Sequence, residues 1–330
     1  EDDILPINEG DRIGLIGQFA KKPRYQGNGS SLIQPTKIST LFEAMHAHYH
    51  ENLWYADGYS IESDDIDDQR IDDAVDIAKK VDKVILMVGL TEDYESEGFD
   101  RKHLNIPKSH QALVDAISKT NSQLIICLSN GAPVLMPWID HAKGIVEGYL
   151  GGQASGLALF DVLTGRVNPS GRLAETFPND LNELPSSAHF PGTNRQVIYK
   201  EALYIGYRAY DALGINPLFS FGHGLSYTSF SYENLSVSTD SHEVKIEVSI
   251  KNSGQRAGKE VIQVYVTKVG SHVYRPEQEL KAFQKVYLNP QETKVVNLSI
   301  PIESLNSYQK GPKIEDGHYH IKVGHSSRDI

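Results

Sequence analysis

The chain of 330 residues carries 32 Lys and Arg against 43 Asp and Glu, a formal net charge of −11. This length indicates about two domains, and 39% hydrophobic with 23% charged residues is typical of an ordinary globular protein. An acidic chain lacks the basic groups that neutralise phosphates, so the composition argues against a nucleic-acid partner and against an anionic membrane surface. No apolar run approaches the roughly 20 residues of a membrane-spanning helix. The single cysteine, Cys127, lies in the apolar run 124–128, which predicts a buried strand thiol and not a nucleophile.

Residues 1–176 alternate short apolar runs with amphipathic segments. The apolar runs are 12–17, 83–89, 123–128 and 144–149, and the helical patterns lie at 71–81, 113–117 and 154–163. This alternation predicts an open, mainly parallel α/β sheet with helices on both faces, an α/β sandwich. In such sheets the ligand-binding loops follow the carboxyl ends of the strands.

Residues 229–330 follow a different pattern. Hydrophobic and polar side chains alternate with period two at 243–250, 261–266, 294–300 and 318–323, and no useful helical pattern appears. We predict an all-β sandwich of the immunoglobulin or fibronectin III type.

The stretch between these parts, 177–228, is rich in Pro, Gly, Ser and Tyr. A loop of this length is uncommon unless it is functional or crosses a neighbouring surface. Its aromatic residues favour a packed connector over a disordered tether, and we expect them to pack the connector and not to line a sugar subsite.

The segment 89–101 follows the predicted strand 83–89 directly. Five carboxylates crowd into nine of its residues, namely Glu92, Asp93, Glu95, Glu97 and Asp100. Like charges in close proximity raise some carboxyl pKa values, and a general acid near neutral pH needs a raised pKa. Arg101 could hold Asp100 ionised as a structural brace. From the residues alone, a solvated acidic loop is favoured over a catalytic one.

A glycine-containing loop, 23–31, follows the first predicted strand. Gly27 and Gly29 would let the backbone approach a ligand closely. The loop has neither the Rossmann glycine spacing nor a P-loop Gly-Lys-Ser, so it gives no specific indication of a nucleotide.

Two candidate metal sites have simpler interpretations. His46, His48 and His50 alternate, but a helical pattern surrounds them and would leave only His46 and His50 on one face. The acidic run 64–68 lacks the glycine and bidentate Glu of a calcium loop, and it predicts an acidic helix N-terminus. We therefore expect no metal and no cofactor.

Motifs in a fixed order extend over nearly the whole chain. They are the loop 23–31, Glu95-Ser-Glu-Gly-Phe-Asp-Arg101 with Leu104-Asn-Ile-Pro107, Asn168-Pro-Ser-Gly-Arg-Leu173 with Thr176-Phe-Pro178, Pro217 to Thr228, and 317–327. Together they resemble glycoside hydrolase family 3, the β-glucosidase and β-xylosidase family. The loop 23–31 is similar to the family's Gly-Gly-Gly-Ser-Ser loop, with Asn28 in place of one glycine.

The resemblance implies a retaining mechanism. An Asp on an N-terminal (β/α)8 barrel is then the nucleophile, and a Glu on a loop of the α/β-sandwich domain is the general acid/base. Glu97 matches that Glu, and Glu95 is the runner-up. Asp100 and Arg101 would shape the loop, and Ser30 or Ser31 could reach the sugar.

The barrel and its nucleophile are missing from this chain. A retaining site needs two carboxyl groups roughly 5–5.5 Å apart, so we expect the chain alone to be inactive. The resemblance implies that the parent hydrolyses terminal β-D-glucosyl residues, with a β-glucoside or oligosaccharide as substrate and the N-terminal barrel as the chain's partner. Without the barrel, we expect the loop 91–103 to be mobile or distorted and its surroundings to be apolar.

Three explanations for the missing barrel stay open. The chain could be a cloned or proteolysed C-terminal half, or part of a protein in which the barrel follows the sandwich. It could also be a natural barrel-less module that binds carbohydrate or serves as a scaffold. One cysteine and no visible signal segment favour the cytoplasm, although a missing N-terminus would hide an export signal. A homo-oligomer stays open as well.

Overall fold

The computed structural model describes residues 4–30, 32–308 and 311–330. The chain divides into two compact units, Glu1–Val167 and Asn168–Ile330. The predicted boundaries at residues 176 and 228 remain predictions. Among the described residues, no helix is long and apolar enough to cross a membrane.

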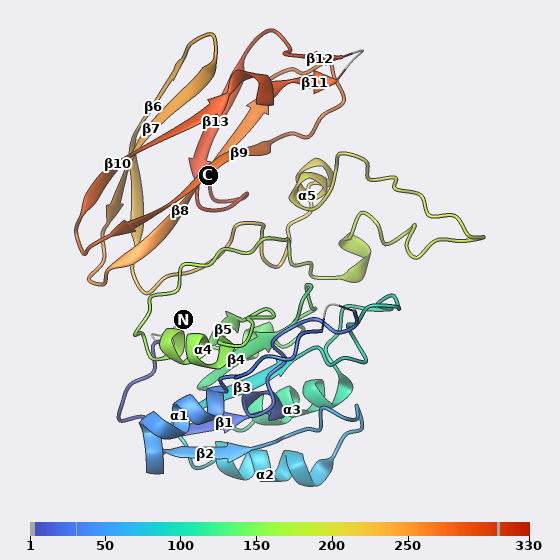
Figure 1. The fold of residues 1–330 in the computed structure, drawn as a ribbon, viewed down its shortest axis with the longest axis vertical. Coiled ribbons are helices and arrows are strands. Elements are labelled where there is room, and N and C mark those ends of the chain that lie inside the picture. Colours follow the sequence, from blue (N-terminus) through green and yellow to red (C-terminus); the bar gives the residue numbers. More distant parts are fainter. Residues whose placement is uncertain (1–3, 31, 309–310) are drawn as a thin grey trace. The chain divides into compact units, whose positions relative to one another are not determined.

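The first unit is built on a parallel five-stranded sheet with the order β2-β1-β3-β4-β5 (Figure 1). The strands are β1 (Ile13–Ile16), β2 (Leu53–Ala56), β3 (Lys83–Gly89), β4 (Leu124–Ser129) and β5 (Gly144–Glu147). The central strands β3 and β4 are almost entirely buried, because their apolar runs face helices on both sides. Cys127 in β4 is fully buried, which confirms the predicted strand thiol.

Four helices cover this sheet. They are α1 (Leu41–Tyr49), α2 (Asp68–Ala78), α3 (Lys108–Ser118) and α4 (Ser155–Leu163). The chain moves from β1 to β2 in one direction and then back past β1 to β3. Right-handed crossovers therefore place α1 on one face and α2 with α3 on the other. Helix α1 packs against α4, and α2 packs against α3 (Figure 1). The predicted α/β architecture is confirmed.

The acidic run 64–68 leads into a helix, as expected. The side chain of Asp67 caps α2 by accepting a hydrogen bond from the backbone N–H of Arg70 at 3.2 Å. His46 and His48 lie on α1, and His50 follows its last residue. Among the described residues, no three His, Cys, Asp or Glu side chains come together as metal ligands.

The second unit contains an antiparallel β-sandwich. Its main sheets have the orders β10-β7-β6 and β13-β8-β9. Their strands are β6 (Phe230–Thr239), β7 (Glu243–Asn252), β8 (Gly258–Lys268), β9 (Glu279–Leu288), β10 (Thr293–Pro301) and β13 (Tyr319–Gly324), and a short hairpin joins β11 (Ser307–Tyr308) to β12 (Pro312–Lys313). Alternate residues of β7 and β10 pack with β8 in one core, for example Ile246, Leu298 and Val264. The predicted fibronectin III-like sandwich is confirmed.

The segment before this sandwich carries one helix that the sequence patterns did not predict, α5 (Tyr207–Leu213). The ring of Tyr207 stacks on Phe221 at 5.0 Å between centroids, and its hydroxyl accepts a hydrogen bond from the backbone N–H of Leu280. Tyr210 is buried, whereas Tyr199 is 80% exposed. Within the second unit, some aromatic residues of the segment 177–228 are therefore packed, and others are exposed.

Candidate functional site

The two candidate loops leave neighbouring strands of the parallel sheet. The loop after β1 carries Arg24 and Ser30, and the loop after β3 carries Glu95 and Glu97. Because β1 connects outward to β2 while β3 lies on its other side, the sheet has its topological switch point between β1 and β3. Open α/β sheets bind ligands in the crevice at this point. The fold thus brings together two loops that are far apart in the sequence.

Glu97 is an exposed carboxylate held by the β1 loop. Its Oε2 accepts a hydrogen bond from the backbone N–H of Ser30 at 2.6 Å, and its own N–H donates to the carbonyl of Asn28 at 3.4 Å. A side chain at Gly29 would collide with Glu97, and the backbone of Gly29 has a φ of +105°. A glycine is therefore required where the two loops meet.

The electrostatics of Glu97 differ from the sequence-based expectation. Hydrogen bonds from the hydroxyl and the backbone N–H of Ser30 stabilise the charged carboxylate and lower the pKa of Glu97 below its usual value. The expectation that crowding would raise carboxyl pKa values is wrong for Glu97 in this chain, because the hydrogen bonds from Ser30 outweigh the effect of desolvation.

Glu95 occupies a different environment. Its side chain is 20% exposed, and its Oε2 lies 3.3 Å from Nη2 of Arg24, which itself is 5% exposed. The same Nη2 donates to the backbone carbonyl of Glu95 at 2.7 Å. The backbone N–H of Gly131, after β4, donates to Glu95 Oε2 at 2.8 Å. Glu95 therefore joins three strand-end loops.

Asp100 and Arg101 lie beyond Glu97 in the same loop. They help to line an open hollow of about 300 Å³. Arg101 donates to the backbone carbonyl of Pro133 at 3.1 Å, and Asp100 is exposed. A loop-shaping role for both, including the predicted brace between them, stays a prediction. Ser31 lies outside the described residues.

Further contacts within this chain hold the acidic loop. Asn28 Nδ2 donates to Glu92 Oε2 at 3.1 Å, and the hydroxyl of Tyr94 donates to Asp64. Phe99 is 49% exposed on this loop, so one large apolar side chain does face outward.

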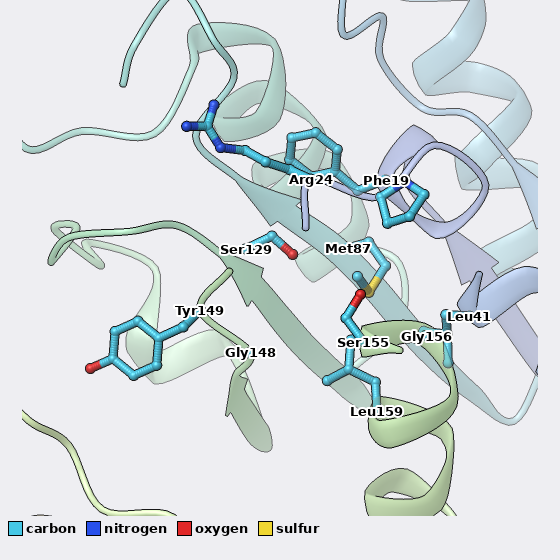
Figure 2. A pocket seen from close by; sticks show the side chains of 11 residues that line it. Phe19, Arg24, Leu41, Met87, Ser129, Gly148, Tyr149, Ser155, Gly156 and Leu159 are labelled. Carbon is cyan, nitrogen blue, oxygen red and sulfur yellow. The ribbon is translucent and has the colours of Figure 1, made fainter. Parts of the chain in front are cut away.

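A small cavity of about 10 Å³ lies within the first unit (Figure 2). It is lined by residues at the carboxyl ends of the strands and at the start of α4, among them Arg24, Met87, Ser129, Tyr149 and Ser155. This volume matches about one water molecule and is too small for a sugar.

Sequence reasoning missed the buried residues beneath the loops. The hydroxyl of Tyr59 donates to the carbonyl of Met87 and accepts from the N–H of Phe19, which ties β3 to the segment after β1. His110 Nδ1 accepts from the N–H of Gly89 at 3.3 Å, and burial lowers the pKa of His110 to about 3. Arg24 was also missed, although an arginine in a loop after one strand and an acidic loop after another were visible signals.

Comparisons with known proteins agree with this architecture. The profile of the Glycosyl hydrolase family 3 C-terminal domain matches residues 1–227, and that of a Fibronectin type III-like domain matches residues 260–327. Thermostable beta-glucosidase B of Acetivibrio thermocellus is 48% identical over 100% of this chain and 45% of its own length. An Exo-alpha-(1->6)-L-arabinopyranosidase of Bifidobacterium breve is 37% identical over 100% and 45%. The chain thus spans less than half the length of these curated relatives.

Solved structures give the same result. The GH3 beta-glucosidase of Bifidobacterium adolescentis is 38% identical with a TM-score of 0.96, covering 100% of this chain and 49% of that chain. Beta-glucosidase 3B from Thermotoga neapolitana, in complex with glucose, is 32% identical with a TM-score of 0.89, covering 100% and 50%. With the parallel sheet, the sandwich and the matched profiles, the chain belongs to glycosyl hydrolase family 3.

Proposed function

We propose that this chain forms the C-terminal part of a retaining, exo-acting β-glucosidase in which Glu97 is the general acid/base. The position of Glu97 carries the proposal. It is an exposed carboxylate at the switch point of the sheet, in a family whose relatives include beta-glucosidases. The barrel-less binding or scaffold module is the alternative.

Glu97 suits this role better than Glu95. A general acid/base must exchange a proton with the substrate and with water, which requires an accessible carboxyl group. Glu95 accepts hydrogen bonds from the backbone N–H of Gly131 and from Arg24, and only 20% of its side chain is exposed. Glu97 is bound on one oxygen by Ser30 and is otherwise exposed.

A second carboxylate has to come from elsewhere. Retaining glycosidases place the nucleophile roughly 5–5.5 Å from the acid/base. Glu95 is already paired with Arg24 and is therefore unsuited to that role. We propose that the nucleophile is an Asp on the N-terminal barrel, and that this chain alone is inactive.

The reaction has two steps, and Glu97 acts in a different protonation state in each. First, protonated Glu97 donates its proton to the glycosidic oxygen while the nucleophile bonds to C1, and the aglycone leaves as a neutral alcohol. Then the Glu97 carboxylate removes a proton from water, whose oxygen displaces the nucleophile at C1. Glucose leaves with its β configuration retained.

The lowered pKa of Glu97 fits the second state, not the first. In this chain the carboxylate is exposed to water, whereas a bound sugar and a barrel would desolvate it. Desolvation disfavours the charged form and raises a carboxyl pKa. We propose that Glu97 becomes a proton donor only in the assembled site.

The preferred sugar is proposed from the relatives. A β-glucoside follows from the 48% identity to Thermostable beta-glucosidase B, while the 37% identity to an Exo-alpha-(1->6)-L-arabinopyranosidase makes an L-arabinopyranoside the competing substrate. Both belong in the assay.

The test compares three proteins. They are this chain alone, the product of the full reading frame that encodes it, and a chimera in which this chain replaces the matching 45% of Thermostable beta-glucosidase B. The substrates are an alkyl β-glucoside, a 2,4-dinitrophenyl β-glucoside and the corresponding α-L-arabinopyranosides. We expect no turnover by the chain alone and turnover by the chimera.

The decisive variant is Glu97→Gln. Because an alkyl alcohol needs a proton to leave, kcat/KM for the alkyl glucoside should fall by about 10²–10⁴-fold. Dinitrophenolate leaves without a proton, so its release should fall much less. The control is Glu92→Gln, which keeps an oxygen for Asn28. Turnover by the chain alone, or full alkyl-glucosidase activity of the Glu97→Gln chimera, would refute the proposal. A full reading frame without a barrel that binds glycosides and does not hydrolyse them would favour the alternative.

A further inference from the structure

We infer that Arg24 is a positioning residue for Glu97, acting through Glu95 on the backbone that carries the acid/base. The inference rests on the proposed role of Glu97 and assigns to Glu95 a part in holding the loop in place of proton transfer. The observation behind it is that the loops after β1, β3 and β4 come together around the buried Arg24–Glu95 pair.

The contacts of Arg24 are directed at one short segment. Its Nη2 donates to the backbone carbonyl of Glu95 at 2.7 Å and lies 3.3 Å from Glu95 Oε2. Arg24 and Leu159 are both among the residues that line the small cavity (Figure 2). The carbonyl that it holds is only two residues before Glu97, so Arg24 restrains the backbone of the acid/base itself.

Gly131 completes the arrangement from the third loop. Its N–H donates to Glu95 Oε2 at 2.8 Å. A Cβ on residue 131 would meet the two carboxylate oxygens at 2.9 and 3.0 Å, so a side chain there would have to displace the carboxylate of Glu95. Glu95 is thereby fixed between the loops after β1 and β4.

The β1 loop holds Glu97 on both sides. Arg24 restrains the chain before it, while Ser30 binds its carboxylate and Asn28 accepts its N–H. One loop therefore sets both the backbone position and the carboxylate position of Glu97.

The burial of Arg24 indicates that the Arg24–Glu95 pair positions the three loops more than it stabilises the fold. Arg24 is 5% exposed at its side chain, and its Nε and Nη1 are buried without a hydrogen-bond partner among the described residues. Removing charges from water offsets most of the attraction in such a pair, and apolar replacements are often as stable. A buried pair that joins three loops instead specifies how they stand relative to one another.

The experiment uses the active chimera or full-length enzyme with Arg24→Met, Arg24→Lys and Glu95→Gln. Displacing a catalytic group by about 1 Å can cost about 10²-fold in rate. We expect Arg24→Met to lower kcat/KM for an alkyl β-glucoside by about 10–100-fold, with little change for the dinitrophenyl glucoside. The thermal midpoint should fall as well, because the single replacement leaves the carboxylate of Glu95 without its cation. Arg24→Lys keeps the charge but not the two-point contact, and it should recover part of the activity.

The control is Arg12→Met. Arg12 pairs with Asp82 at the opposite ends of the same two strands, so its loss should leave both substrates unaffected. Equal losses for both glucosides in Arg24→Met, or no loss for either, would overturn the inference. If Arg24→Met fails to fold, Arg24→Lys and Glu95→Gln provide the test instead. For each, the loss of kcat/KM on the alkyl glucoside is compared with the loss on the dinitrophenyl glucoside. Failure of the proposed function itself would appear separately, as an alkyl-glucosidase activity that survives Glu97→Gln.

Discussion

The backbone N–H of Ser30 donates to Oε2 of Glu97 at 2.6 Å, although the two residues are 67 positions apart. This contact joins the loop after β1 to the loop after β3. It places the proposed acid/base at the switch point of the sheet and stabilises its ionised form.

Ser30→Ala should raise the pKa of Glu97 toward its usual value. The hydroxyl of Ser30 makes the larger contribution to the lowered pKa and the backbone N–H, which remains, makes the next. Because the folded pKa lies below the usual one, this interaction stabilises the chain above the usual pKa and is lost as the pH falls through the folded pKa. NMR titration of the side-chain carboxyl carbons measures the change.

Ser96→Ala is the matched control for this titration. The Ser96 hydroxyl lies in the same loop but donates to the backbone carbonyl of Glu97. Removing the Ser96 hydroxyl should leave the pKa of Glu97 unchanged. A pKa that is identical in the parent chain and in Ser30→Ala would contradict the assignment.

Gly29→Ala should displace Glu97, whereas Gly27→Ala should be tolerated. Gly29 has a φ of +105° and no room beside Glu97, while Gly27 has open space around the added carbon. A non-glycine residue in such a backbone region costs about 1–3 kcal/mol. Urea unfolding and the NMR shifts of the 92–97 segment should separate the two variants. Equal behaviour of both would show that the close approach is not required.

Arg172→Met should destabilise the second unit. Arg172 Nη2 lies 2.6 Å from Glu260 Oε2, with 11% and 2% of the two side chains exposed, and the hydroxyl of Tyr232 donates to the same carboxylate. Removing one partner leaves a buried charge and costs about 3–5 kcal/mol. The double replacement Arg172→Met with Glu260→Met should recover much of this loss.

Hydrogen exchange of β7 and β8 can follow the second unit during unfolding. Trp54 and Trp138 both lie in the first unit, so their fluorescence provides an internal reference that should not change. Lys245→Met, which removes an exposed ion pair with Asp240, is the control and should have little effect. If Arg172→Met and Lys245→Met lowered the stability of the second unit equally, burial would not explain the importance of the Arg172–Glu260 pair.

Cys127 should resist thiol reagents in the folded chain. Burial raises the pKa of Cys127 to about 12, and the thiolate is the reactive form. Labelling with a chromogenic disulfide should be negligible in buffer and complete in denaturant. Rapid labelling of the native chain would mean that β4 opens readily.

The central elements of the fold could be predicted from the sequence because their patterns are local. The apolar run 83–89 became β3 with the same bounds, and the alternation at 243–250 lies within β7. β2, which is only partly buried, and β6, whose residues are mostly exposed, were missed. Edge strands bury less apolar surface, so their sequences carry a weaker pattern.

The candidate site was predictable only in part. The motif around Glu97 marked the acidic loop, and the loop carrying Ser30 was also marked. The pairing of Arg24 with Glu95 was not visible, because it depends on which strands are neighbours. The proposed brace from Arg101 to Asp100 assumed that residues adjacent in sequence would interact.

The sequence by itself determined the two fold classes, the family resemblance and the loop that carries Glu97, since periodicity and motifs are properties of short segments. Only the tertiary structure decided that Ser30 and Arg24 hold this loop, and that the pKa of Glu97 is lowered and not raised. Ionisation and position depend on groups brought close by the strand order β2-β1-β3, and distances across a sheet are not encoded in any one segment.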